Sequence, residues 1–112
     1  MKILHNPRCG KSRDTLKLIQ AAGIDPEIIL YLTDTPSKIE LAEILKKLEV
    51  SAESILRTGE AIFKEKFKGK SFSEDEWLDI MIDNPKLIER PIVVKGDTAV
   101  IGRPPENVNK LL

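Results

Sequence analysis

The first third of the chain alternates between short apolar runs and a helical repeat. The short segment 2–5, with Ile3 and Leu4 at its centre, predicts a strand, and the repeat at 10–22 predicts a helix that Gly23 ends. A second run at 27–32, largely apolar and partly β-branched, predicts a strand buried on both faces, as in a parallel pair. The apolar stripe of the helix consists of Leu16, Ile19 and Ala22. Together these elements predict a βαβ unit.

The middle of the chain has the polar and apolar pattern of helices. Ser37 is followed three residues later by Glu40, and Ser73 is followed in the same way by Glu76, so that each pair predicts a capping box at a helix start. A further short helical segment is expected around 54–56. The apolar stripes that follow the two caps are Leu41, Ile44, Leu45 and Leu48, and then Trp77, Ile80 and Met81.

The last third returns to strand patterns. Runs at 91–94 and 98–101, separated by Lys-Gly-Asp, predict a β-hairpin, and 106–112 predicts a last helix. The order βαβ, helical middle, ββα predicts an α/β chain with a thioredoxin-like three-layer fold and a helical insertion. We expect a single domain that spans 1–112, since a domain usually occupies about 100 to 200 residues.

Charge and cysteine content narrow the class of protein. The 18 basic and 18 acidic residues cancel, so no global field attracts nucleic acid or an anionic membrane. One cysteine excludes an internal disulfide, and the spacing of a structural zinc site is absent, which predicts a reducing setting and no metal. The start of the chain is too short and polar for a signal peptide, and no apolar run has membrane-spanning length. We therefore expect a soluble, cytoplasmic protein.

The cysteine itself, Cys9, stands in the segment 6–13, Asn-Pro-Arg-Cys-Gly-Lys-Ser-Arg, where the first strand passes into the first helix. A helix N-terminus and neighbouring cations lower the pKa of a thiol from its usual value of about 8.5 and favour the thiolate, which is the nucleophilic form. A lone cysteine is often only a small buried hydrophobe. Here the polar neighbours provide no apolar wall, which favours a reactive thiol.

Three better-known loops fit this segment poorly. A nucleotide-binding Walker loop would have a glycine where the chain has His5, and a tyrosine-phosphatase loop would have an arginine at Thr15. A Cys-x-x-Cys dithiol is excluded because Ser12 takes the place of the second cysteine. Redox chemistry at Cys9 would therefore need a second thiol from another molecule.

Four arginines stand where predicted elements begin or end, and each is a candidate for binding a tetrahedral oxyanion. Guanidinium groups bind such anions in a fork geometry that lysine lacks. Two of the four precede a proline, and a thioredoxin-like layout places Pro91, whose peptide bond could be cis, beside the first strand-to-helix turn. That would bring Arg90 near Cys9. Any one of the candidates can equally be a solvated surface residue. They are Arg13, Arg57, Arg90 and Arg103.

The remaining polar residues of the segment allow two interpretations each. His5 is either a structural residue at a strand end or a group that tunes the thiol, and Ser12 is either a helix cap or a donor to the thiolate. No carboxylate pair or His/Glu cluster suggests acid–base or metal chemistry.

Several motifs together resemble the glutaredoxin-coupled arsenate reductase family, over nearly the whole chain. They are His5 to Arg13, Ile29-Leu30-Tyr31-Leu32, Leu56-Arg57, Arg90-Pro91-Ile92-Val93 and Gly102-Arg103-Pro104. The resemblance implies a thioredoxin-like fold with Cys9 as nucleophile. It also implies oxyanion-binding arginines at Arg57, Arg90 and Arg103, and places the residues that lower the thiol pKa at His5 and Ser12.

The resemblance implies reduction of arsenate to arsenite. The Cys9 thiolate would attack arsenic(V), glutathione would attack the adduct as co-substrate, and glutaredoxin would resolve the mixed species, with no bound cofactor. A monomer is expected. The alternative is a related branch of transcription regulators that bind RNA polymerase and sense thiol stress, usually through a Cys-x-x-Cys switch, which Ser12 argues against.

Overall fold

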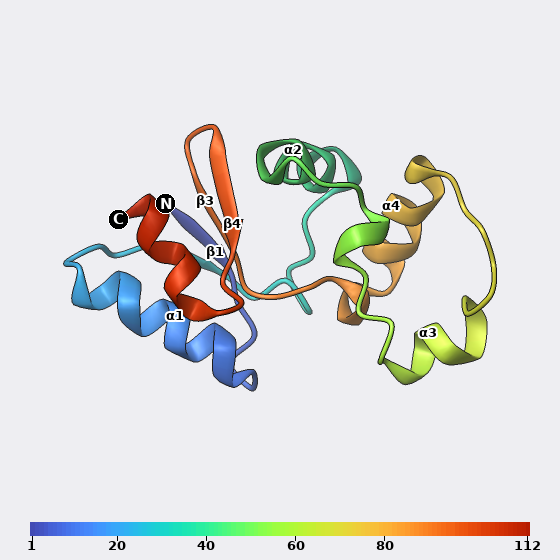
Figure 1. Ribbon diagram of the computed structural model, residues 1–112, viewed down its shortest axis with the longest axis horizontal. Helices are drawn as coiled ribbons and strands as arrows, with labels where there is room; N and C mark the ends of the chain where they lie inside the picture. Colours follow the sequence, from blue (N-terminus) through green and yellow to red (C-terminus); the bar gives the residue numbers. More distant parts are fainter. The chain divides into compact units, whose positions relative to one another are not determined.

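The computed structural model describes residues 1–112 and divides them into two compact units (Figure 1). The sheet unit contains Met1–Asp34 and Arg90–Leu112. The helical unit contains Thr35–Glu89, the segment that the sequence predicts as a helical insertion. Each unit is described by itself.

The sheet unit is built on four strands in the order β2-β1-β3-β4. Strand β1 (Lys2–Leu4) pairs parallel with β2 (Glu27–Ile29) and antiparallel with β3 (Ile92–Lys95). The hairpin partner β4 (Thr98–Ile101) pairs antiparallel with β3. The predicted βαβ unit and the predicted hairpin are therefore confirmed, and they meet in one sheet through β1 and β3.

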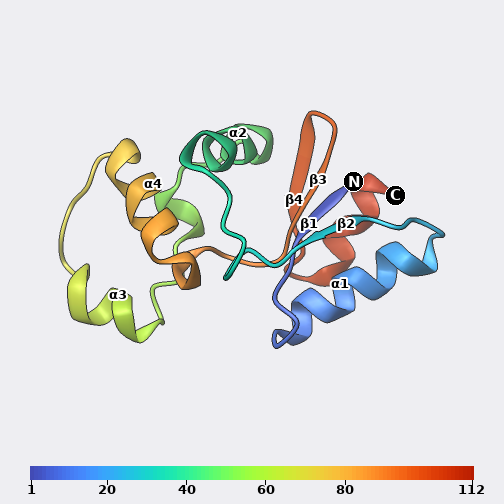
Figure 2. The same cartoon turned by 180° about the vertical axis from the view of Figure 1, so that it is seen from behind.

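One face of this sheet is covered by two helices. Helix α1 (Gly10–Ala21) and the 3₁₀ helix η3 (Pro105–Leu111) lie side by side in both views (Figure 1 and Figure 2). The core beneath them consists of Ile3, Ile19, Val93, Val108 and Leu111. The predicted last helix thus exists, with 3₁₀ geometry, and its apolar side closes the core.

The prediction of a strand at 27–32 buried on both faces is wrong. Strand β2 ends at Ile29, and the side chains of Ile28 and Leu30 are each 44% exposed. The physical reason is the strand order, because β2 is an edge strand with a neighbour on one side only. An apolar run alone does not distinguish a central strand from an edge strand.

The predicted apolar stripe of α1 is only partly correct. Ile19 is fully buried, but Leu16 is half-buried and Ala22 is exposed. The first half of the buried face is polar instead, and consists of Ser12 and Thr15. A helix that packs its first turns against backbone can bury hydroxyl groups there, provided that they are hydrogen-bonded.

The partner of the buried Thr15 is the backbone after strand β4. The Thr15 hydroxyl donates to the carbonyl of Lys11 at 2.8 Å and lies 3.4 Å from the carbonyl of Gly102. Gly102 approaches so closely that a Cβ atom there would collide with the Thr15 side chain and lie 2.8 Å from Cγ of Pro91. This contact holds the segment that leads into Arg103.

We expect Gly102→Ala to lower the free energy of unfolding by about 1–3 kcal/mol, because overpacking forces the backbone apart. Urea denaturation measures the change. Gly59→Ala is the matched control, since a Cβ atom at Gly59 meets nothing within 4 Å and its effect should stay within about 0.5 kcal/mol. Equal stability of the two variants would show that the close approach at Gly102 does not constrain the fold.

The helical unit contains three α-helices and two short 3₁₀ helices. They are α2 (Lys38–Leu48), η1 (Glu53–Ile55), α3 (Ala61–Lys66), α4 (Glu74–Asp83) and η2 (Pro85–Leu87). No helix of the protein combines the length and apolar composition needed to cross a membrane.

Both predicted capping boxes are confirmed. The Ser37 hydroxyl accepts the Glu40 backbone N–H at 3.1 Å, and the Glu40 carboxylate accepts the Ser37 N–H at 3.1 Å. Ser73 and Glu76 repeat this reciprocal pair at 3.2 and 2.9 Å. Each box satisfies two backbone donors that a helix start otherwise leaves without partners.

An aromatic cluster fills the helical unit around Trp77, which is 3% exposed and belongs to the core as the sequence predicts. Phe72 contacts the indole edge-on at a centroid distance of 4.8 Å, and Phe63 stacks on it at 6.4 Å. Helix α3, which carries Phe63, is not predicted from the sequence. It has six residues and none of them is buried, so its sequence contains no apolar stripe that would predict a helix.

Candidate active site

Cys9 stands at the junction between β1 and α1 and is the N-cap residue of the helix. Its N–H donates to the carbonyl of Asn6 at 3.0 Å, and its own carbonyl accepts the N–H of Arg13 at 3.0 Å. The side chain is half-buried and carries a free thiol. This position exposes the sulfur to the positive end of the helix dipole, as the sequence predicts.

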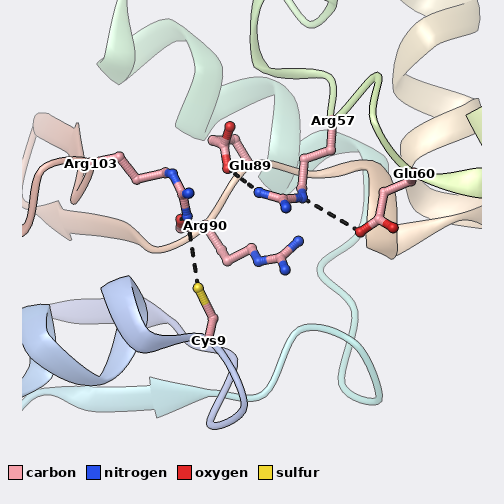
Figure 3. Close-up of polar contacts among 6 residues, drawn as sticks. All are labelled: Cys9, Arg57, Glu60, Glu89, Arg90 and Arg103. Carbon is pink, nitrogen blue, oxygen red and sulfur yellow. Dashed lines mark hydrogen bonds and ion pairs between the residues drawn. The ribbon is translucent and has the colours of Figure 1, made fainter.

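Two arginines interact with the Cys9 sulfur in the sheet unit, and the contact of Arg103 is drawn in Figure 3. Nη1 of Arg103 donates to Sγ of Cys9 at 3.7 Å and to the carbonyl of Arg90 at 3.2 Å. The Arg90 side chain also interacts with the sulfur through charge and a hydrogen bond. Both arginines precede a cis proline, Pro91 and Pro104. The expected approach of Arg90 to Cys9 is therefore confirmed.

These groups change the acidity of the thiol. Burial raises the pKa of the Cys9 thiol, but the backbone N–H of Ser12, the Arg90 guanidinium and the backbone N–H of Lys11 together outweigh it and hold the pKa below its ordinary value. The thiolate fraction at neutral pH is correspondingly larger than that of a free cysteine. The site therefore favours the nucleophilic form of its sulfur.

The acidity of Cys9 can be measured from the pH dependence of its alkylation by iodoacetamide. Because only the thiolate reacts, the rate should rise with pH through a midpoint below the value of about 8.5 found for free cysteine. In Arg90→Met the midpoint should move up, because the charge and the hydrogen bond that stabilise the thiolate are lost. Arg8→Met removes an exposed neighbouring cation and should shift the midpoint less. Equal midpoints in all three proteins would contradict this account.

His5 and Ser12 form a buried pair behind the cysteine. Nδ1 of His5 lies 2.6 Å from Oγ of Ser12, and this hydroxyl also accepts the N–H of Asn6 at 3.1 Å. Burial, and next the charge of Arg13, lower the pKa of His5 from its ordinary value, so that the imidazole is neutral at pH 7. Interpreting Ser12 as the helix cap is wrong, because Cys9 is the N-cap. A contribution of the two side chains to the acidity of Cys9 stays a prediction.

Arg13 and Asn6 support the loop that carries the cysteine. Nη1 of Arg13 donates to the carbonyl of Pro7 at 3.0 Å, and the Asn6 side-chain oxygen accepts the N–H of Arg8 at 3.0 Å. Asn6 is buried, and the Asn6-Pro7 pair predicts a turn in the sequence, but nothing in the sequence predicted this side-chain contact. A role of Arg13 in oxyanion binding stays a prediction.

Arg57 belongs to the helical unit and follows η1. Its Nη1 donates to the Glu89 carboxylate at 2.7 Å, and its Nε lies 3.5 Å from the Glu60 carboxylate (Figure 3). The role of Arg57 as an oxyanion-binding residue remains a prediction from the sequence resemblance.

The comparison with protein families decides the classification. The model of the ArsC family matches residues 4–111. The chain belongs to the ArsC family. The resemblance to arsenate reductases found in the sequence motifs is thereby confirmed at the level of the family.

Individual relatives of this ArsC-family protein match over its whole length. The uncharacterized protein YfgD of Escherichia coli K12 is 46% identical, covering 100% of this chain and 96% of the relative. The arsenate reductase of Haemophilus influenzae is 43% identical, covering 98% and 97%. The solved structure of an arsenate reductase from Vibrio cholerae superimposes with a TM-score of 0.94 at 43% identity, covering 99% and 96%. The ArsC chain accordingly has the thioredoxin-like α/β fold.

One further residue of the ArsC site was missed in the sequence. Nδ2 of Asn107 donates to the carbonyls of Ile101 at 3.1 Å and Arg103 at 3.2 Å, and so fixes the backbone that presents the Arg103 guanidinium. Its partners are backbone carbonyls, which leave no pattern in the sequence. No group of three or more His, Cys, Asp or Glu side chains is arranged to hold a metal ion.

Proposed function

We propose that this ArsC-family protein is an arsenate reductase that converts arsenate to arsenite with Cys9 as its nucleophile. The observation that carries the proposal is the Cys9 sulfur at a helix N-terminus with the guanidinium groups of Arg90 and Arg103 beside it. The same donors that favour the thiolate also suit a tetrahedral oxyanion. Relatives named arsenate reductase, at about the same chain length, support this substrate.

The first step forms a bond between Sγ of Cys9 and arsenic(V). An arsenate oxygen takes up protons and leaves as water, so that the arsenic stays pentavalent in a thiol–arsenate ester. Arg90 and Arg103 neutralise the charge on the remaining oxygens as the thiolate approaches. His5 and Ser12 hold the Cys9 loop in place through their buried hydrogen bond.

The reduction itself needs two further thiols, because arsenic takes up two electrons and the chain has only one cysteine. Glutathione attacks the ester and displaces a second oxygen as water. The glutaredoxin thiolate then attacks the glutathione sulfur, a disulfide forms between the two, and the electron pair of the arsenic–sulfur bond stays on arsenic, which becomes trivalent. Water releases arsenite and returns the Cys9 thiolate.

The identity of the electron donor that supports turnover tests this proposal. NADPH oxidation is followed with arsenate and this protein, using either glutathione, glutaredoxin and glutathione reductase or thioredoxin and thioredoxin reductase. We expect arsenate-dependent oxidation with the first set and little with the second. Turnover with thioredoxin alone would contradict the proposed donors, and absence of turnover with both sets would contradict the reductase function.

A further inference from the structure

The turn between strand β4 and helix η3 carries Arg103, whose side chain reaches the Cys9 sulfur. Nη1 of Arg103 donates to Sγ of Cys9 at 3.7 Å (Figure 3), and it also donates to the carbonyl of Arg90 at 3.2 Å. An arginine side chain loses about 2 kcal/mol of rotamer entropy when it is held in one conformation. A fixed backbone at Arg103 reduces the number of conformations from which this contact has to be selected.

The side-chain amide of Asn107 fixes that backbone. Its Nδ2 donates to the carbonyl of Ile101 at 3.1 Å and to the carbonyl of Arg103 itself at 3.2 Å. The carbonyl of Ile101 also accepts the N–H of Arg103 at 2.9 Å, so backbone and side chain close the turn together. The NH₂ group of the amide thus holds the two residues that flank Gly102.

Asn107 is itself anchored in the core of the sheet unit. It lies in the first turn of η3, where its N–H donates to the carbonyl of Pro104 at 3.0 Å. The next residue, Val108, is fully buried, and Leu111 is 5% exposed. The amide therefore links a packed helix to the arginine that contacts the sulfur.

We propose that Asn107 is a positioning residue of the candidate active site, which holds the Arg103 backbone so that the guanidinium stays beside the Cys9 sulfur. Asn107 acts through Arg103, since its amide donates to backbone carbonyls of the turn. Without the amide, Arg103 samples conformations away from the sulfur, and the thiolate loses part of its stabilisation. The proposal concerns contacts within the sheet unit and does not depend on arsenate as the substrate.

A merely structural role would be different, because Asn107 would then stabilise the connection between β4 and η3 and leave the sulfur unaffected. Both roles predict a lower free energy of unfolding when the amide is removed. Only the positioning role predicts that the pKa of the Cys9 thiol rises through Arg103. Asn107 carries no charge, so a neutral replacement removes no charge from the site.

The charged and titratable groups around the thiol all remain in such a variant. They contact the sulfur or lie in its loop and in the first turn of α1, and they are His5, Arg8, Lys11, Arg13, Arg90 and Arg103. A shift of the thiol pKa therefore reports a change in how these groups are placed or in how the sulfur is buried. Removal of Arg103 separates the two causes.

The test is the pH dependence of Cys9 alkylation by iodoacetamide in Asn107→Leu, which approximately keeps the volume of the side chain and removes its donors. We expect the midpoint to rise by up to about 1 pH unit in Arg103→Met, the low end of the range for a nearby opposite charge, because the site is partly open to water. Asn107→Leu should show at least about half of that rise. Asn109→Leu is the matched control on the same helix, and its midpoint should stay that of the unmodified protein because Asn109 is exposed.

The variant that combines Arg103→Met with Asn107→Leu should have the midpoint of Arg103→Met alone, because residues that act through one contact are not additive. If Asn107→Leu does not fold, Asn107→Ala is a second neutral variant with the same expected direction. An unchanged midpoint in a folded Asn107 variant, an unchanged midpoint in Arg103→Met, or full additivity in the combined variant would overturn the proposal.

Alkylation requires no arsenate, so the measurement separates this proposal from the reductase function. Raised midpoints in both single variants of a protein that forms no arsenite would leave the positioning role standing and remove the reductase function. Arsenite formation with an unshifted midpoint in Asn107→Leu would do the reverse. In the active enzyme we expect Asn107→Leu to lower kcat/KM for arsenate, by less than Arg103→Ala does, and this last expectation rests on the proposed function.

Discussion

Replacement of Cys9 by serine is expected to lower arsenate-dependent turnover by at least about 10⁴-fold, because the proposed reaction loses its nucleophile. A serine hydroxyl at the same helix N-terminus stays protonated, since the donors that ionise the thiol cannot offset the far higher pKa of an alcohol. No second cysteine can take over. The rate is measured as arsenate-dependent NADPH oxidation with glutathione, glutaredoxin and glutathione reductase.

The control for this variant is anion binding. Cys9→Ser changes one atom and leaves the hydrogen bonds of the loop backbone in place, so we expect it to bind arsenate in calorimetry. A folded Cys9→Ser protein that keeps more than about one hundredth of the turnover would exclude Cys9 as the nucleophile.

Loss of Arg103 should have the second-largest effect. We expect Arg103→Ala to lower kcat/KM for arsenate by about 10²–10³-fold, the size found when one donor to a developing oxyanion is removed. Nη1 of Arg103 contacts the Cys9 sulfur, so the substitution removes a charge beside the proposed nucleophile. Initial rates over a range of arsenate concentrations give the value.

Two matched variants show whether the geometry of Arg103 matters or only its charge. Arg103→Lys keeps the charge without the fork of donors and should recover only part of the loss. Arg8→Ala removes an exposed cation from the same loop as Cys9 and should change kcat/KM less than about three-fold. Similar losses in Arg8→Ala and Arg103→Ala would show that only the net charge of the region counts.

The elements that the sequence predicts well are those whose geometry is determined by residues close together in the chain. The capping boxes at Ser37 and Ser73 are visible because the cap and its partner are three residues apart. The hairpin is visible because Gly96, with φ of 58°, sits between two β-branched runs. In each case the residues that determine the geometry are neighbours in the chain.

The elements that the sequence predicts poorly depend on distant partners. The exposed edge position of β2 follows from the strand order, which its own residues do not encode. Thr15 is buried because Gly102, far along the chain, admits its hydroxyl. Helix α3 is held by ring contacts such as that of Phe63 with Trp77 rather than by a stripe of its own.

The residues of the candidate site also fall into those that the local sequence predicts and those that depend on distant partners. Cys9 and its turn are recognisable from neighbouring residues. Arg103 is recognisable from the sequence as a candidate for oxyanion binding, but its contact with Cys9 joins positions 94 apart in the chain and was not predicted. Nothing in the sequence indicated that Arg57 is paired with Glu89, because both residues stand outside the regular helices and strands. An ion pair between two such positions can be recognised only in the three-dimensional structure.

The most direct test of the central claim is to measure the arsenic species that the protein forms. The purified protein is incubated with arsenate, glutathione, glutaredoxin, glutathione reductase and NADPH, and arsenite is quantified by chromatography with elemental detection. The account predicts about one arsenite for each NADPH oxidised, since both conversions transfer two electrons, and none with Cys9→Ser. NADPH oxidation without arsenite, or equal arsenite from the Cys9→Ser protein, would contradict it.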